Sequence, residues 1–285
     1  ILTKIYSEEE IYNNAGWNFI IPELREGKFE KELNEQNKLN DIVQLSDLRG
    51  ILHNHTTYSD GIHTLEQMAN YCKELGYEYL GINDHSQYAV YAKGLKPERI
   101  IEQHKEIDEL NKKLFPFKIF KSIEADILPD GSLDYNNEIL ASFDFVVASI
   151  HSAMKMNEEK ADTRLIKAIE NQHTTILGHP TGRLLLSRPG YPINHKKIID
   201  ACAANKVVIE LNANPNRLDI DWTWIPYCME KGVMISINPD AHKMEGYHDM
   251  HYGTLAARKG GLIKEMTFNA LSLEEIEKWF LEKKK

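Results

Sequence analysis

The sequence has 285 residues, of which 42% are hydrophobic and 27% are charged, and its formal net charge is −9. These proportions are typical of globular proteins and exclude a disordered or fibrous chain. No apolar run approaches the roughly 18 residues that a membrane helix needs, so we expect no membrane partner. The acidic balance gives no general attraction to nucleic acid, so any DNA binding must come from a local basic patch, a bound metal or another domain.

The cysteines and the first residue bear on the origin of the chain. Cys72, Cys202 and Cys228 are scattered and odd in number, which does not predict a disulfide framework and favours a reducing cytoplasm. The chain opens on Ile1 rather than Met, and we therefore expect it to be the C-terminal part of a longer protein. Residues 1–48 are highly charged and poor in apolar residues, which predicts a linker with one or two short helices before a domain formed by residues 49–285.

From Gly50 onward, short apolar runs alternate with longer helical patterns. The predicted strands are 50–53, 79–83, 117–124, 145–151, 174–179, 207–212 and 233–238. The predicted helices are 65–75, 97–114, 163–170, 195–204, 222–231 and 273–281. Strands that alternate with helices indicate βαβ units and a parallel sheet, so the fold class is α/β. Seven such units predict a closed or nearly closed barrel of the TIM-barrel kind.

Chelating side chains follow almost every predicted strand. They are His53, His55, Asp60, His85, Glu124, His151, His179, Asp240 and His242. The carboxyl ends of the strands of a parallel barrel converge on one mouth, where the loops build the active site, so we expect these nine residues to meet. His53 and His55 are two residues apart, which on a strand places both rings on the same side, and Asp240 and His242 repeat this spacing.

Imidazoles together with carboxylates are typical ligands of Zn²⁺, Mn²⁺ or Fe²⁺. Nine ligands, one of them a shared carboxylate, would hold two or three divalent ions. Such a cluster activates water and stabilises phosphoryl oxygens, which predicts phosphate ester hydrolysis. Arg183 and Arg217 follow the fifth and sixth strands, and the planar fork of an arginine matches phosphate oxygens. Arg183 has a structural alternative, in which it pairs with a buried carboxylate.

Several longer motifs carry a family resemblance. They are Pro22-Glu23-Leu24-Arg25, His53-Asn54-His55-Thr56, Asp84-His85-Ser86, Glu124-Ala125-Asp126, His179-Pro180-Thr181-Gly182-Arg183, Glu210-Leu211-Asn212 and Asp240-Ala241-His242. From about residue 8 to residue 280, the chain resembles the C-terminal PHP domain of bacterial family X DNA polymerases. One departure is Pro239, which stands where that family more often has a threonine.

The resemblance implies a distorted seven-stranded (β/α) barrel with metal-dependent 3′–5′ exonuclease activity in DNA repair. It further implies DNA as the partner, through single-stranded or gapped 3′ ends, with an upstream polymerase domain in cis and a place at the bacterial nucleoid. By resemblance, His53, His55, Glu124 and Asp240 hold one ion, and Glu124 bridges to a second ion at His151. Asp60 and His85 help to hold a third, and His179 and His242 divide between the second and the third.

Two alternative functions stay open at the level of sequence. A stand-alone phosphatase of small phosphate monoesters, of the histidinol-phosphate type, would use the same ligands. A non-catalytic scaffold would bind metal for folding or docking and would hydrolyse no phosphoester.

Overall fold

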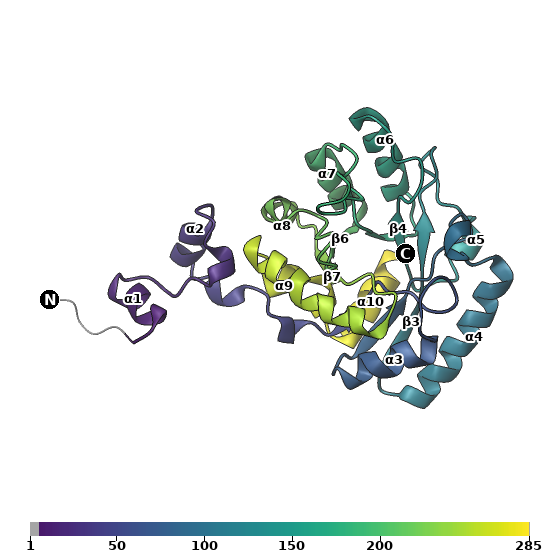
Figure 1. Cartoon of the computed structure of the whole chain (residues 1–285), viewed down its shortest axis with the longest axis horizontal. Coiled ribbons are helices and arrows are strands. Elements are labelled where there is room, and N and C mark those ends of the chain that lie inside the picture. Colours follow the sequence, from purple (N-terminus) through teal and green to yellow (C-terminus); the bar gives the residue numbers. More distant parts are fainter. Residues whose placement is uncertain (1–5, 285) are drawn as a thin grey trace.

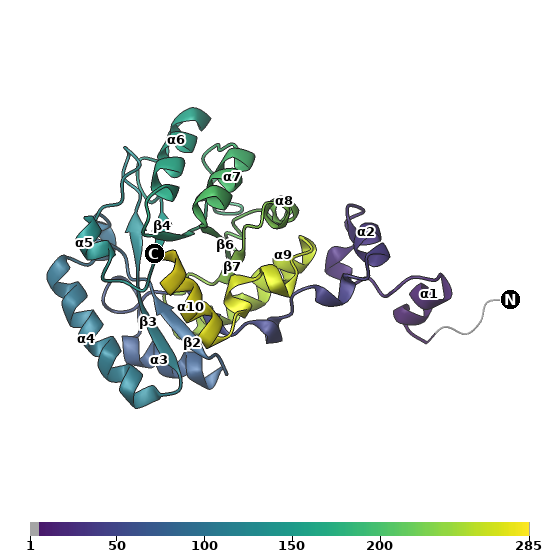
Figure 2. The ribbon, with the colours of Figure 1, turned by 180° about the vertical axis from the view of Figure 1, so that it is seen from behind.

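Seven parallel strands, neighbours in chain order from β1 to β7, form the centre of the computed structural model, which describes residues 6–284. Their bounds are β1 Gly50–Ile51, β2 Tyr79–Ile82, β3 Lys118–Asp126, β4 Phe145–Ser149, β5 Thr174–Leu177, β6 Val208–Asn212 and β7 Ile235–Asn238. Helices surround the strands, as Figure 1 shows, and Figure 2 gives the opposite view. The α/β barrel fold and all seven predicted strands are therefore confirmed.

The helices agree with the sequence less closely. Their bounds are α1 Glu8–Asn14, α2 Glu30–Glu35, α3 Leu65–Glu74, α4 Pro97–Leu114, α5 Asn137–Leu140, α6 Glu158–Ile169, α7 His195–Asn205, α8 Ile225–Glu230, α9 Met250–Lys259 and α10 Leu273–Lys283. Helix α4 has the predicted bounds, whereas α6 begins five residues earlier than predicted, after the N-cap Asn157. None of the helices within residues 6–284 has both the length and the apolar character that a membrane span requires.

Helix α9 was not predicted, and a glycine explains why. Gly253 lies in the middle of α9 and lowers its intrinsic helix propensity. A Cβ at this position would come within 2.4 Å of Ala213 and 2.7 Å of Ile237, so the glycine lets α9 approach the barrel closely. Tertiary packing, rather than local propensity, therefore stabilises this helix.

The interior of the barrel is apolar at one end and polar at the other. Along β3 the side chains with one orientation are Phe120, Ser122, Glu124 and Asp126, because alternate residues of a strand face the same side. Phe120 lies in an aromatic cluster with Phe145 and with Phe280 of α10, whose ring stacks on that of Phe145 at 4.9 Å. Helix α10 thus closes the amino-terminal end of the barrel, and the polar residues gather at the carboxyl end.

Side-chain amides complete the barrel where β1 meets β7. The side-chain carbonyl of Asn238 accepts a hydrogen bond from the Leu52 N–H at 3.1 Å. The buried Asn269 amide donates to the carbonyls of Gly50 (3.0 Å) and Ile237 (2.7 Å) and accepts from the Ile237 N–H at 3.0 Å. Beyond the strands, the His55 N–H donates to Ala241 at 2.8 Å. These bonds hold the chain after β1 against the chain after β7.

The segment before the barrel contains the short helices expected there. Helices α1 and α2 lie to one side of the barrel, beyond α9 (Figure 1). The later part of the segment packs on the barrel, since Leu24 and Val43 are fully buried and Glu23 pairs with Arg258 of α9 at 3.1 Å. The division into a linker of residues 1–48 and a domain of residues 49–285 stays a prediction.

Replacing Asn269 with alanine should destabilise the fold, because it removes the bridge between β1 and β7 and leaves buried backbone groups without partners. We expect the free energy of unfolding to fall by about 2–4 kcal/mol. Urea unfolding followed by circular dichroism measures this change. Asn70→Ala, which removes one hydrogen bond to Glu66 on the surface of α3, is the matched control and should cost about 0.5 kcal/mol or less. Equal effects of the two substitutions would contradict the bridging role of Asn269.

Candidate metal centre

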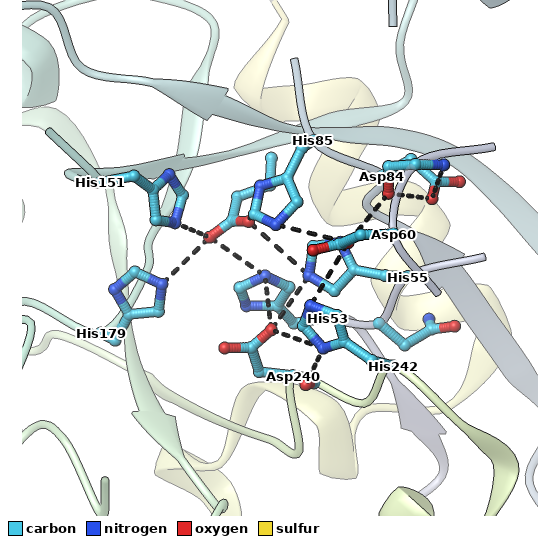
Figure 3. A network of polar contacts seen from close by, with 12 residues as sticks. His53, His55, Asp60, Asp84, His85, His151, His179, Asp240 and His242 are labelled. Carbon is cyan, nitrogen blue, oxygen red and sulfur yellow. Dashed lines mark hydrogen bonds and ion pairs between the residues drawn. The ribbon is translucent and has the colours of Figure 1, made fainter. Parts of the chain in front are cut away.

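The carboxylate of Glu124 lies at the polar end of the barrel, in contact with five imidazoles. Figure 3 labels these histidines, whose rings gather around one point. One oxygen, Oε1, lies 3.0 Å from His179 Nε2, 3.1 Å from His151 Nε2 and 3.3 Å from His53 Nε2. The other, Oε2, lies 3.0 Å from His85 Nδ1 and 3.6 Å from His55 Nε2. Glu124 is 1% exposed, so these contacts are shielded from water.

The other predicted residues extend this cluster toward the solvent. Asp240 Oδ1 lies 3.0 Å from His55 Nε2. Asp60 Oδ1 lies 3.4 Å from His242 Nε2 and 3.7 Å from His85 Nε2. The structure therefore brings all nine predicted residues together. The side chains of His242 and Asp60 are 39% and 33% exposed, so the cluster opens to solvent at their side.

The backbone conformation that brings these residues together differs from the predicted one. Strand β1 ends at Ile51, so His53 and His55 lie beyond it, although both rings still face the cluster. Asp240 follows Pro239 and has a positive φ of 52°, and His179 has a φ of 23°. Strained backbone of this kind is concentrated at functional sites, where the surrounding structure maintains it.

Two carboxylates orient the histidines from behind. Glu210 Oε2 lies 2.6 Å from His53 Nδ1, and Asp126 Oδ1 lies 3.1 Å from His151 Nδ1. Such contacts fix the ring orientation and leave the opposite nitrogen, Nε2, facing the cluster. Glu210 was absent from the predicted site residues. The available signal was its position near the carboxyl end of β6, the one strand to which no chelating residue had been assigned.

Asp84 organises the loop that carries Asp60. Its carboxylate accepts hydrogen bonds from the backbone N–H groups of Thr56 and Ser59, from both of their hydroxyls and from the amide of Gln103. Asp84 is completely buried, so these bonds replace the water that it loses. Asp84 therefore shapes the loop without facing the cluster.

The two predicted arginines have different surroundings. Arg217 Nε lies 3.6 Å from Asp240 Oδ2, at the edge of the cluster. Arg183 donates to the carbonyls of Arg217 (2.9 Å) and Leu218 and forms an ion pair with Asp221 at 2.8 Å. These contacts favour a structural role for Arg183, which holds the loop that carries Arg217, although the carboxylate that it pairs with, Asp221, is 32% exposed rather than buried.

The pKa of Glu124 is lowered and those of two neighbouring histidines are raised, which shows that the carboxylates of the cluster are stabilised by positive charge. Burial alone would raise the pKa of Glu124, but His151, His53 and His85 hold it well below its ordinary value. Burial would lower the pKa of His151, but Glu124 and Asp126 raise it to about 10. Similarly, Asp60 and Asp240 overcome burial and raise the pKa of His242 to about 9. Protons on His151 and His242 therefore supply positive charge in a metal-free protein.

The unpartnered atoms of the cluster fit bound metal better than protons. His53 Nε2, His55 Nδ1, His85 Nδ1, His179 Nδ1 and Glu124 Oε2 are buried without a hydrogen-bond partner. Three overlapping groups offer ligand atoms within 4.8 Å of one another: His55, Asp60, His85 and His242; His53, His55 and Glu124; and His85, Glu124 and His151. Buried polar atoms are costly unless they are satisfied, and divalent ions would satisfy His53 Nε2, His85 Nδ1 and Glu124 Oε2, which face one another in the cluster.

Comparison with known proteins agrees with the fold and the site. The model of the PHP domain family matches residues 52–214, which is more than half of the chain. The chain therefore belongs to the PHP domain family. The cluster of histidines and carboxylates is the kind of site that the metal-dependent phosphoesterase chemistry of this family requires.

Three relatives illustrate the range of similar proteins. The chain is 43% identical over 271 residues to the DNA polymerase/3′-5′ exonuclease PolX of Bacillus subtilis, a match that covers 95% of this chain and 47% of that protein. It is 24% identical over 205 residues to a protein of Clostridium novyi named "Probable phosphatase", covering 67% of this chain and 78% of that protein. The histidinol phosphate phosphatase of Lactococcus lactis, solved with zinc, L-histidinol and phosphate, has a TM-score of 0.57 at 17% identity and covers 75% of this chain and 94% of that chain.

These matches differ in what they establish. The chain spans about half of the length of Bacillus subtilis PolX, so it corresponds to one part of such a protein. The likeness to the Lactococcus lactis structure is at low sequence identity and shows the barrel fold alone.

Metal affinity should depend on pH, because an ion displaces the protons held by the imidazoles. In the metal-free protein His151 titrates at about 10 and His242 at about 9, both raised pKa values, so both are protonated at neutral pH. We expect the affinity for Mn²⁺ to rise as the pH is raised from neutral toward these values, with protons released on binding. Titration calorimetry in buffers of different ionisation enthalpy measures the affinity and the number of protons released. A pH-independent affinity without proton release would contradict this account.

Proposed function

We propose that the chain is a metal-dependent phosphoesterase that removes nucleotides from DNA 3′ ends, as the 3′–5′ exonuclease module of a family X DNA polymerase in DNA repair. The observation that carries the DNA part is the 43% identity to a protein named DNA polymerase/3′-5′ exonuclease over 95% of this chain. The match to the Clostridium novyi phosphatase is weaker and shorter, with 24% identity over 67% of the chain. An upstream polymerase domain in cis and a place at the bacterial nucleoid belong to the same proposal.

Two or three divalent ions, of Mn²⁺, Zn²⁺ or Fe²⁺, would be held by the nine clustered residues. His53, His55, Glu124 and Asp240 would hold one, and Glu124 would be shared with a second. The 3.0 Å approach of His179 to Glu124 supports a place for His179 beside His151 at the second ion. The 3.4 Å approach of His242 to Asp60 supports a place for His242 at a third ion with His85.

Bound divalent ions would supply an activated water and stabilisation of phosphate charge. Side chains of the protein would orient the metal ligands and bind the phosphate of the substrate. Glu210 and Asp126 hold the rings of His53 and His151 in fixed orientations. Arg217, whose side chain is 19% exposed, would bind a phosphate oxygen at the open edge of the cluster. Arg183 would position Arg217 through the carbonyl that it binds.

The proposal is tested by hydrolysis of a 5′-labelled single-stranded oligonucleotide, compared with histidinol phosphate and an aryl phosphate ester. Each reaction is run with Mn²⁺ and with a chelator. We expect stepwise shortening from the 3′ end that requires metal. Asp240→Asn should abolish it, whereas Asp108→Asn, which alters only a surface ion pair with Lys121, should not.

Other outcomes separate the alternatives. Hydrolysis of the small monoesters alone would favour a small-molecule phosphatase. Metal binding without hydrolysis of any substrate would favour a scaffold, or an exonuclease that needs its polymerase domain. Addition of a polymerase domain in trans distinguishes these two, since it restores activity only to the exonuclease.

The proposed role of Arg217 predicts a loss of phosphate binding on substitution. Arg217→Gln should lower kcat/KM for DNA by about 10- to 100-fold, since charge-assisted hydrogen bonds contribute about 1.5–3 kcal/mol. The metal content should stay unchanged, because Arg217 offers no ligand atom. Arg188→Gln is the matched control, since Arg188 bonds the Gly182 carbonyl in the neighbouring loop. Steady-state kinetics with metal analysis checks this, and equal losses in both variants would count against a phosphate contact.

A further inference from the structure

Large hydrophobic side chains are exposed around the opening of the cluster. We call this set the apolar rim: it consists of Ile62, Tyr88, Val90, Tyr91, Leu185 and Leu186. They lie in the loops that follow β1, β2 and β5, which all belong to the carboxyl-terminal face of the barrel. Val90 is 80% exposed, Tyr91 72% and Leu186 fully exposed. Exposed apolar side chains gathered at one opening indicate a binding surface.

Direct contacts tie this rim to the cluster. The ring of Tyr91 lies 6.2 Å from that of His85, measured between centroids. The Ile62 N–H donates to the His242 carbonyl at 2.8 Å. Tyr91 therefore borders the buried His85, and Ile62 borders the partly exposed His242. Across the opening, the Leu185 N–H donates to the Asn216 carbonyl at 2.6 Å, which places the Leu185–Leu186 loop beside Arg217.

We propose that the apolar rim binds unpaired nucleobases, with Tyr91 as the stacking platform for the base of the 3′-terminal nucleotide. This inference rests on the proposed function and specifies its substrate as a single-stranded end. In a nucleotide one sugar separates the phosphate from the base, so a base would reach the rim while its phosphate lies at the cluster. Aromatic side chains stack on any base, which gives binding without sequence preference.

A groove beside Tyr91 offers room for a further nucleotide. Its volume is about 570 Å³, and its lining includes Tyr88, Val90, Lys96, Pro97 and Leu128. It combines apolar side chains and Lys96 with two carboxylates, Glu98 and Asp134, so its apolar part suits a base. A protein partner fits this position less well, because docking on the rim would cover the side of the cluster where Asp60 and His242 are exposed.

The first test compares ends with and without a base. We expect Tyr91→Ala to raise KM about tenfold, or about 1.4 kcal/mol, for an oligonucleotide with a normal 3′-terminal base, since the variant loses the stacking on that base. The same variant should leave KM unchanged for an oligonucleotide whose 3′-terminal nucleotide is abasic. Tyr91→Phe should retain the wild-type values. The matched control is Tyr252→Ala, because Tyr252 is an exposed tyrosine of α9 away from the rim.

The second test does not need turnover. An oligonucleotide with 2-aminopurine as its terminal base and a phosphorothioate last linkage should lose fluorescence on binding to the wild type and to Tyr91→Phe, but not to Tyr91→Ala. If the wild type cleaves DNA, either of two results would overturn the stacking proposal alone. One is a Tyr91→Ala substitution that changes KM equally at normal and abasic ends. The other is an absence of fluorescence quenching by the wild type. Absence of DNA cleavage even after addition of the polymerase domain in trans would overturn the proposed function, while quenching would still report base binding. Tighter binding of fully paired 3′ ends would also contradict the proposal.

Discussion

The arrangement of the site depends on one buried carboxylate that contacts five imidazoles. Glu124 places its two oxygens within 3.0–3.6 Å of His53, His55, His85, His151 and His179. A buried carboxylate is stable only when positive charge compensates it, so the surrounding groups must bring protons or metal ions. Because the segments after four strands, β1, β2, β4 and β5, contribute these rings, the whole mouth of the barrel is organised around a single side chain.

The barrel keeps this charged site away from its own hydrophobic core. Alternation along β3 leads from Phe120, at the aromatic end that α10 closes, to Glu124 and Asp126 at the mouth. Gly81 of β2 contributes to this arrangement, since a Cβ there would come within 2.4 Å of the Phe145 ring. The stability of the fold is therefore concentrated at one end and the chemistry at the other, which is the usual division in β/α barrels.

Much of this arrangement could be predicted from the sequence, for physical reasons. Parallel strands leave a strong signal in short apolar runs, and their carboxyl ends must converge, so the meeting of His53 with Asp240 followed from topology alone. The local argument for His53 and His55 was wrong in detail, because β1 ends at Ile51 and strand alternation does not reach them. Their position instead depends on the bonds between the chain after β1 and the chain after β7.

The features that escaped prediction have little or no signal in the residues around them. Asn269 bridges to Gly50 across 219 residues, and nothing near Asn269 in the chain indicates that contact. Glu210 resembles any strand glutamate until His53 is seen 2.6 Å away. Likewise, Gly253 argues against a helix until its close approach to Ala213 is known. In each case the residue type is explained by a partner that only the folded chain brings near.

The central claim is that Glu124 is shared between metal ions, and anomalous diffraction tests it most directly. Crystals grown with Mn²⁺ would be measured on both sides of the manganese absorption edge. The account predicts at least two anomalous peaks bonded to the Glu124 carboxylate, with His53 and His55 at one ion and His151 at another. A single ion, or ions that do not contact Glu124, would contradict it.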